Sequence, residues 1–405
     1  MLIMPGLIDG HNHFNHILQK GLIPDNHNTV SFAKLVEPFL ASLTPTDEYY
    51  CTLHGSLEMI GTGTTCSADP GSEHPEAVVK AAVESGMRNV VCKWVWDRTF
   101  IGEKKDTDTQ IKELEKVTRE YRSLEDGRIK SQAAILGVSF TCSDELILAA
   151  KQIADKYGVG FYAHWSSFKE EVDWSLENLK IRPIEHLEKL GVLAPNVNLS
   201  HMTQIADHEV QILAKHDVKV VHNVGTALKL VKGLSRPEAK FPELLDAGVT
   251  VCLGTDGANC ANFHDMTRAM YLVAVLFKDI RYDPNRMGAE TAIEMGTING
   301  AKALLWDKEI GSIEKGKKAD IILFNMQRLE WIPVYNEVQN LIYSANGDSV
   351  ETVIIDGKII MENKKFVTLD EYAIMDKITE LSKEILKRIP DQKPTYTLKS
   401  PWKFV

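Results

Sequence analysis

Short apolar segments alternate with amphipathic segments through the first two thirds of the chain, and this rhythm constrains the fold more than any other feature. Eight apolar segments have the length of strands: residues 7–13, 61–67, 89–94, 129–137, 160–164, 197–201, 218–222 and 250–254. Strands that alternate with helices are typical of parallel sheets, and eight of them favour a distorted (β/α)8 TIM barrel, which we place at residues 5–310. A doubly wound open sheet is the alternative, but no glycine-rich phosphate turn follows the first strand.

The segments between these strands carry helix signals. Helices are expected at residues 44–60, 74–85, 107–124, 143–157, 183–190, 207–216 and 236–247. The first of them shows the clearest start signal, because Thr44 can cap the helix, Pro45 suits its first position and Asp47 lies in its first turn.

Polar residues gather where the predicted strands end. His11 and His13 end the first strand, and their i, i+2 spacing directs both side chains to one face. His164, His201 and His222 end the fifth, sixth and seventh strands, and Asp256 follows the eighth. Each histidine alone could be structural. Because barrel enzymes place their catalytic groups at the C-terminal ends of strands, the joint placement predicts a metal site.

Composition limits the classes of partner. The chain has 405 residues, 44% of them hydrophobic and 25% charged, and a net charge of −10 without a long basic run. These values fit an ordinary globular protein and argue against nucleic acid or an anionic membrane as partner. No apolar run is long enough to span a membrane, and six scattered cysteines fit reduced thiols, so a cytoplasmic location is expected.

The pattern changes after residue 305. Apolar strand segments at 321–324 and 350–360, the latter with an Asp356-Gly357 turn, predict a small β module at residues 311–365. An amphipathic helix is expected at 369–388, within a C-terminal helix and tail that covers 366–405.

Several motifs resemble the amidohydrolase superfamily. They are Pro-Gly-Leu-Ile-Asp-Gly-His-Asn-His at 5–13, Gly-Thr-Thr at 63–65, Cys-Ser-Asp-Glu-Leu at 142–146, Gly-Thr-Asp-Gly-Ala at 254–258 and Gly-Ser-Ile-Glu-Lys-Gly-Lys-Lys-Ala-Asp at 311–320. The resemblance extends from residue 5 to about residue 365, and its closest branch is the mononuclear-metal group of triazine hydrolases and cytosine, guanine and adenosine-type deaminases.

The resemblance implies one divalent metal ion, Zn²⁺ with Fe²⁺ as the alternative. The matching positions make His11, His13, His164 and Asp256 the ligands, and His201 the residue that contacts the substrate and the metal-bound water. The two-metal branch needs a carboxylated lysine at the end of strand four, where this chain has residues 137–140, Gly-Val-Ser-Phe. The family also commonly forms homo-oligomers.

The expected reaction follows from this metal chemistry. A divalent ion lowers the pKa of bound water to about 7, and the resulting hydroxide would attack a carbon of a small aromatic N-heterocycle and release ammonia. Asp256 would move the proton and His201 would polarise the substrate. Two alternatives remain: hydrolysis of another bond, such as ring C–Cl, an N-alkylamino group or a cyclic amide, and a non-catalytic scaffold, against which the complete ligand set argues.

One position departs from the resembled branch. Its deaminases usually carry a glutamate three residues after the strand-five histidine, where this chain has Ser167. Glu170 or Glu171 could reach into the site in its place, but on a helix or loop they are expected to face solvent. Strand seven departs as well, because His222 is followed by Asn-Val-Gly-Thr-Ala instead of a proline and a Ser-Asn pair. Both departures put ordinary purine or pyrimidine deamination in doubt.

Further candidates for substrate binding lie near the strand ends. Trp94, Trp96 and Phe100 could stack on a planar ring, although core or loop packing explains them equally well. His222 and Asn259 are candidates for the pocket wall, and a helix cap is the alternative role for Asn259. His16 and His27 lie in a polar segment that could cover the site or be a plain surface loop.

The resembled family carries β structure before the His-x-His strand, and here four residues precede Pro5. We therefore expect an N-terminally incomplete β-sandwich module with an exposed sheet edge at residues 320–325 or 350–360.

Overall fold

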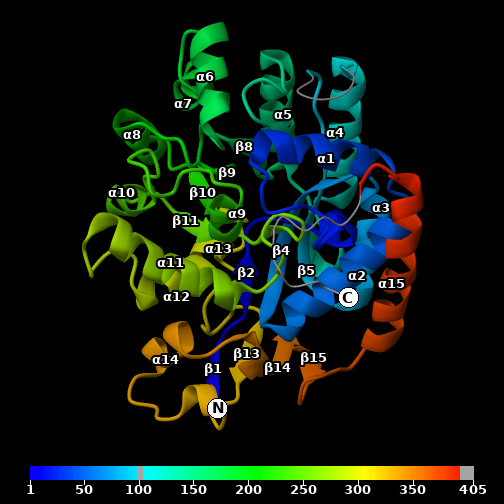
Figure 1. Cartoon of the computed structure of the whole chain (residues 1–405), viewed down its shortest axis with the longest axis vertical. Coiled ribbons are helices and arrows are strands. Elements are labelled where there is room, and N and C mark those ends of the chain that lie inside the picture. Colours follow the sequence, from blue (N-terminus) through cyan, green and yellow to red (C-terminus); the bar gives the residue numbers. More distant parts are fainter. Residues whose placement is uncertain (99–103, 393–405) are drawn as a thin grey trace, which may run out of the picture.

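The computed structural model describes residues 1–98 and 104–392, and its centre is a barrel of parallel strands (Figure 1). Two runs of parallel strands form its wall: β2 (Leu7–Asp9), β4 (Thr64–Ser72), β5 (Arg88–Lys93) and β6 (Ile129–Lys130), then β7 (Ala133–Gly137), β8 (Phe161–Trp165), β9 (Val197–His201), β10 (Lys219–His222) and β11 (Val251–Leu253). A parallel bridge between Val95 and Ile135 joins the two runs. At the other seam, β12 (Asp256–Gly257) pairs with β3 (Asn12–His13).

Helices surround this wall, and six of the seven predicted between the strands begin within one residue of the predicted position. Thr44 and Asp47 form a capping box, as their sequence pattern predicts, and Pro45 is the first residue of α2. The helices between the strands are α2 (Pro45–Gly61), α3 (Pro75–Ser85), α4 (Thr107–Tyr121), α5 (Asp144–Tyr157), α6 (Lys169–Asn178), α7 (Pro183–Leu190), α8 (Asp207–Lys215), α9 (Val224–Lys229), α10 (Phe241–Asp246), α11 (Met266–Arg281), α12 (Ala289–Gly296) and α13 (Ile298–Ala303). Of these, the sequence pattern did not predict α6, α9, α11, α12 and α13.

Side chains fill the barrel interior below the strand ends. One buried cluster draws residues from β2, β4, β5, β7, β8, β10 and β11, among them Ile8, Val90, Tyr162 and Val221. Trp306, which follows α13 and is 1% exposed, belongs to the same cluster and covers one end of the interior. Polar groups can therefore converge at the opposite end, where the strands finish.

Three segments differ from the sequence prediction. The stretch 129–137 is two strands, β6 and β7, which belong to different sheets. The stretch 7–13 is also divided, because Gly10 donates to the carbonyl of Leu253 between β2 and β3. The helix expected at 236–247 is reduced to α10, since the residues before it run as turns. Each difference comes from long-range pairing or turn geometry that a local apolar pattern does not contain.

A second, antiparallel sheet lies at one end of the molecule (Figure 1). Its order is β1 (Leu2–Pro5), β13 (Ile321–Phe324), β14 (Val350–Ile355), β15 (Lys358–Glu362) and β16 (Lys365–Phe366). The prediction of an exposed sheet edge at residues 320–325 or 350–360 is wrong, because the strands there are paired on both sides. β13 pairs with β1 and β14, and β14 pairs with β13 and β15. The first residues of the chain supply the missing partner.

Buried charge joins this sheet to the barrel. Arg88, on β5 and fully buried, donates two hydrogen bonds to the Asp320 carboxylate, at 2.8 and 3.0 Å. Asp320 directly precedes β13, and its carbonyl accepts from the Gly6 amide at the start of β2. The pair therefore fixes the small sheet against the strand that leads to His11.

The remaining elements lie at the sides of the barrel. They are η1 (Phe14–Gln19), α1 (Thr29–Ala41), η2 (Glu125–Gly127), η3 (Leu329–Trp331), α14 (Glu337–Tyr343), η4 (Gly347–Ser349) and α15 (Glu371–Arg388). Figure 1 shows α15 running along the side of the molecule beside α2. All six cysteines are buried and unpaired. In the described ranges, none of the helices combines the length and apolarity needed to cross a membrane.

Candidate metal centre and substrate pocket

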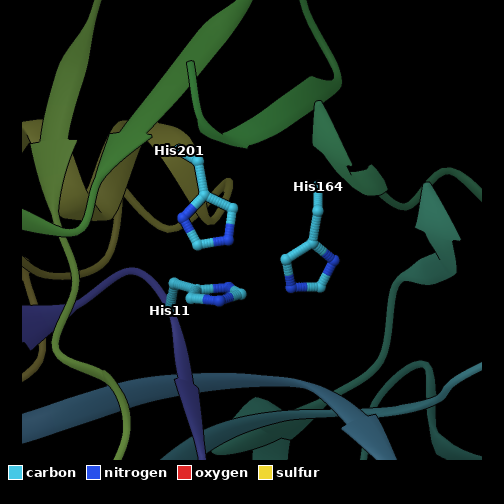
Figure 2. Close-up of side chains that lie close together, drawn as sticks. All are labelled: His11, His164 and His201. Carbon is cyan, nitrogen blue, oxygen red and sulfur yellow. The ribbon is translucent and has the colours of Figure 1, made fainter. Parts of the chain in front are cut away.

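Three histidines and an aspartate converge at the C-terminal ends of the barrel strands. The Nε2 atoms of His13 and His164 lie 3.4 Å apart, and Oδ1 of Asp256 lies 3.6 Å from Nε2 of His11 and 3.7 Å from Nε2 of His13. Figure 2 shows the rings of His11 and His164, together with His201, directed toward one another from separate segments of the barrel wall. The structure thus brings together the four residues that the family resemblance implies as metal ligands.

Hydrogen bonds fix which ring nitrogen of two histidines is free. Nδ1 of His11 lies 2.9 Å from the Tyr162 hydroxyl, which donates at 3.0 Å to the Gly10 carbonyl. The hydroxyl hydrogen is thereby used, so Nδ1 of His11 must be the donor and Nε2 keeps its lone pair. Nδ1 of His164 likewise donates to the Leu136 carbonyl at 2.8 Å. Both Nε2 lone pairs consequently face the point of convergence, as metal-binding histidines require.

The ligand atoms fit one small divalent cation. In tetrahedral coordination with metal–nitrogen bonds of about 2.0–2.1 Å, neighbouring ligand atoms are roughly 3.3–3.4 Å apart, close to the separations seen here. Nε2 of His11 is buried and has no hydrogen-bond partner in the described structure. A cation at this point would satisfy it, and a set of imidazole nitrogens plus one carboxylate oxygen suits Zn²⁺.

Electrostatics put these groups in the protonation states that a metal needs. Burial lowers the pKa of His164 to about 3, helped by the neighbouring His11, and burial lowers the pKa of His13 well below its usual value. Burial alone would raise the pKa of Asp256, but His11, His201 and His13 outweigh it and lower that pKa well below the usual range. Neutral imidazoles and an ionised carboxylate are metal-binding forms.

His201 lies beside the four candidate ligands and differs from them in its hydrogen bonding. The Asn223 amide donates to its Nδ1 at 3.1 Å, so the ring proton resides on Nε2. Nδ1 also lies 3.9 Å from Oδ2 of Asp256. His201 and Asp256 both have positive φ, 77° and 64°, which is uncommon for non-glycine residues and recurs at functional sites.

A glycine allows the approach of the neighbouring strand. Gly137, at the end of β7, has a φ of +72°, and a Cβ added there would lie 2.2 Å from the His164 carbonyl oxygen. Any side chain at position 137 would displace the strand that carries His164. A lysine at this position, which a carboxylated two-metal centre needs, is therefore sterically excluded.

A cavity of about 470 Å³ opens above these residues. Four of the predicted substrate-binding residues, Trp94, Trp96, Ser167 and His201, line it together with His13, His164 and Asp256. Trp94 stacks on the His13 ring with centroids 4.8 Å apart, and α1 contributes Phe32 and Val36 to the opposite wall. The volume and the aromatic lining suit a small planar ring. Phe100 lies outside the described residues.

The structure does not bring the other two predicted substrate residues to the cavity. His222 is fully buried behind it, with its ring stacked on Phe241 at 3.6 Å between centroids, and burial lowers its pKa to about 3. Asn259 donates to the Gln19 side chain at 2.7 Å and accepts from the thiol of Cys260. Both are corrections: strand position alone cannot show that the His222 ring turns outward into the core, or that η1 covers Asn259.

Three further residues line the site or support it, and Lys232 among them was not predicted. His16, which the sequence left open as part of a covering segment or of a plain surface loop, is buried and lines the cavity from η1. Lys232 lines the cavity and donates to the Ser167 hydroxyl at 2.7 Å. Glu171 is fully buried, which corrects the expectation that it faces solvent, whereas Glu170 is exposed as expected. The sequence signal that could have found Lys232 was its position, because it lies in the segment that follows the seventh predicted strand.

Glu171 shapes the loop that carries Ser167. Its carboxylate accepts from the amides of Ser139, Ser166 and Ser167, at 3.2, 3.0 and 2.6 Å, and from the Ser139 hydroxyl. Burial raises its pKa to about 7 although these hydrogen bonds favour the ionised form. Glu171 therefore supports the pocket from behind.

Comparison with known proteins agrees with this geometry. Residues 2–360 match the model of the Amidohydrolase family. A 5'-deoxyadenosine deaminase from Methanobrevibacter smithii is 34% identical over 387 residues, which are 95% of this chain and 86% of that relative. A 5-methylthioadenosine/S-adenosylhomocysteine deaminase from Thermococcus sibiricus is 36% identical over 89% of this chain and 82% of its own length.

Solved structures show the same fold. An adenosine deaminase from Xanthomonas campestris with bound zinc superposes with a TM-score of 0.89 at 26% identity, over 95% of this chain and 86% of its own. An atrazine chlorohydrolase from Arthrobacter aurescens, in complex with zinc and atraton, reaches 0.86 at 23% identity over 94% of this chain and 88% of its own, which shows the fold alone. The chain therefore belongs to the amidohydrolase family, as a metal-dependent hydrolase of C–N bonds of the deaminase type.

Proposed function

We propose that this protein deaminates a small aromatic N-heterocycle, using one divalent ion, Zn²⁺, held by His11, His13, His164 and Asp256. The observation that carries the proposal is the convergence of these side chains, with the Nε2 lone pairs of His11 and His164 directed to one point by Tyr162 and Leu136. When bound, such an ion lowers the pKa of a water molecule to about 7 and so supplies the nucleophile.

The chain's own residues handle the protons. Oδ1 of Asp256 accepts from the Gly257 amide at 2.7 Å, which fixes the carboxylate while Oδ2 faces His201. Asp256 is thus placed to accept a proton and pass it to the leaving group. His201, whose proton is on Nε2, donates a hydrogen bond to the substrate atom that gains charge in the transition state. Trp94 and Trp96 hold the ring flat in the cavity.

The relatives indicate which heterocycles to test first. The relatives described above are named deaminases of 5'-deoxyadenosine, 5-methylthioadenosine and S-adenosylhomocysteine. Adenine nucleosides are therefore among the first compounds to test on this chain. The six buried, unpaired thiols suit a reducing compartment, so the cytoplasm remains the proposed location.

Metal analysis and an ammonia-release screen test the proposal. The purified protein is expected to hold about one zinc ion per chain and to release ammonia from at least one aminopurine, pterin, aminopyrimidine or aminotriazine. His164→Asn should lose the metal, whereas His208→Asn, at an exposed histidine on α8, should retain it. Protein that lacks stoichiometric metal and cannot be reconstituted would refute the proposal. Release of chloride or an alkylamine in place of ammonia would favour the hydrolysis of another ring substituent.

A further inference from the structure

Lys232 is a buried cation whose partner within the protein is a hydroxyl group. The residue is 5% exposed, and its Nζ donates to the Ser167 hydroxyl at 2.7 Å. Within residues 1–98 and 104–392 it forms no ion pair with a carboxylate. An ammonium group has three hydrogens to donate, so the single serine contact leaves donor capacity unused.

Other buried cationic side chains of this protein pair with a carboxylate. The fully buried Arg88 makes two hydrogen bonds to Asp320, and Lys219, which is 7% exposed, pairs with Asp217. Burying an unpaired charge is costly, and burial accordingly lowers the pKa of Lys232 from its usual value, whereas the charge of Asp256 acts in the opposite direction. An anionic ligand beside Nζ would favour the ammonium form. Lys232 is therefore the exception that requires an explanation.

Glu171, the neighbouring buried carboxylate, does not neutralise Lys232. Its oxygens accept from the backbone of Ser139, Ser166 and Ser167, and these contacts hold the loop so that the Ser167 hydroxyl reaches Nζ of Lys232. The lysine is thus positioned by the loop and forms no direct ion pair within the described residues, although the charges of Asp256 and Glu171 favour its ammonium form.

The side chain of Lys232 faces the catalytic cavity. It lines that cavity together with His164, His201 and Asp256. Of the other acidic residues that line it, Glu73 pairs with Lys93 at 3.3 Å, and Glu37 belongs to α1 in the cavity wall. A divalent ion, three neutral histidines and one aspartate carry a net charge of +1, so the adjacent ammonium group makes the inner part of the cavity strongly positive.

We propose that Lys232, held by Ser167, determines substrate specificity by binding an anionic oxygen of the substrate, a carboxylate or a ring oxyanion, in the cavity beside the metal centre. The anionic oxygen of the substrate would accept a charge-assisted hydrogen bond from Nζ of Lys232, in place of a carboxylate of the protein. This inference rests on the proposed function, since both place the substrate in the same cavity, and it narrows the heterocycle to one that carries such an oxygen.

The experiment compares two small planar probes that differ in charge. Nicotinate and nicotinamide share the same ring and nearly the same size, so the ratio of their dissociation constants for the zinc-loaded protein, measured by calorimetry, reports the preference for a carboxylate. The wild-type protein should bind nicotinate at least about tenfold more tightly. Lys232→Met should reduce the ratio to about one, while Lys232→Arg should keep most of it. Zinc content is measured for each variant, because the ion also attracts anions.

A control variant tests whether the loss of any nearby positive charge would have the same effect as the loss of Lys232. Lys229→Met removes a cation at the end of α9, where Lys229 donates to Asn262, and it should leave the ratio unchanged. If Lys232→Met does not fold, Lys232→Gln takes its place, because glutamine keeps hydrogen-bond donors but carries no charge. The same ratio of dissociation constants is then measured for this variant. A wild-type protein without preference, or without measurable binding of either probe, overturns the inference, and so does a preference that survives the loss of Lys232.

The outcome is independent of turnover. A failed ammonia screen refutes the proposed function and leaves the binding ratio valid. Deamination of a neutral heterocycle, with no preference for nicotinate, refutes the role of Lys232 and leaves the proposed function standing.

Discussion

The Tyr162 hydroxyl offers the sharpest test of how the barrel prepares the proposed metal site. It accepts from Nδ1 of His11 at 2.9 Å and donates to the Gly10 carbonyl at 3.0 Å, and it is fully buried. Tyr162→Phe removes this hydroxyl and keeps the ring. Without its acceptor, the His11 proton is no longer held on Nδ1, and the tautomer protonated on Nε2 cannot bind a metal ion through Nε2.

The magnitude follows from the two partners that lose their hydrogen bond. Loss of an outer hydrogen bond to a metal ligand reduces metal affinity about 10–100-fold, which corresponds to roughly 1.4–2.7 kcal/mol. Leaving a buried donor and a buried acceptor unsatisfied costs about 1–3 kcal/mol each, so the metal-free protein should lose about 2–6 kcal/mol of unfolding free energy.

Two measurements separate these effects. Competition with a chromogenic chelator gives the zinc affinity, and urea unfolding of the chelator-treated protein gives the stability. Tyr157→Phe is the control, because its hydroxyl contacts Glu115 near the surface, far from the strand ends. Unchanged zinc affinity in Tyr162→Phe would contradict the assignment of Nε2 of His11 as a ligand atom.

Three further changes probe the fold and the pocket. Arg88→Met leaves Asp320 buried without its partner and should cost about 3–5 kcal/mol of unfolding free energy in urea titrations; an unchanged midpoint would show that the pair does not secure the small sheet. Because burial raises the pKa of Glu171 from its ordinary value of 4.5 to about 7, the folded protein retains a proton that the unfolded chain loses, so stability falls as the pH rises from 4.5 to 7. Glu171→Gln should remove this dependence, worth up to about 3 kcal/mol, and parallel stability–pH curves for the two proteins would argue against it. Ser167→Glu places a carboxylate beside Nζ of Lys232 and should change kcat/KM on any substrate found; an unaltered value would show that position 167 does not contribute to the reaction.

The sequence predicted the parts of the site that strands carry. His11, His13, His164 and His201 each follow an apolar segment of β length, and the rule that barrel sites form at strand ends places them together before any coordinates are known. His222 follows the same pattern and yet packs on Phe241, because the direction of a side chain at a strand end depends on local backbone geometry.

The roles of residues outside the strands could not be predicted from strand positions. Lys232 and Glu171 reach the pocket through loop conformations and contacts with Ser167 and its neighbours, none of which has a periodic signal. The pairing of β1 with β13 was missed for a related reason: it joins residues 2–5 to residues 321–324, and four residues are too few to show an alternating pattern.

The pairing of β1 with β13 has a consequence for biosynthesis. The ribosome delivers His11 and His13 first, but the segment that leads to them is anchored by residues 321–324 and by the buried ion pair of Arg88 with Asp320. Contacts so distant in sequence form late and slowly. The nascent chain therefore carries two of the proposed metal ligands through most of translation before they can be held in place, and we expect the proposed metal centre to form only after the small sheet has closed.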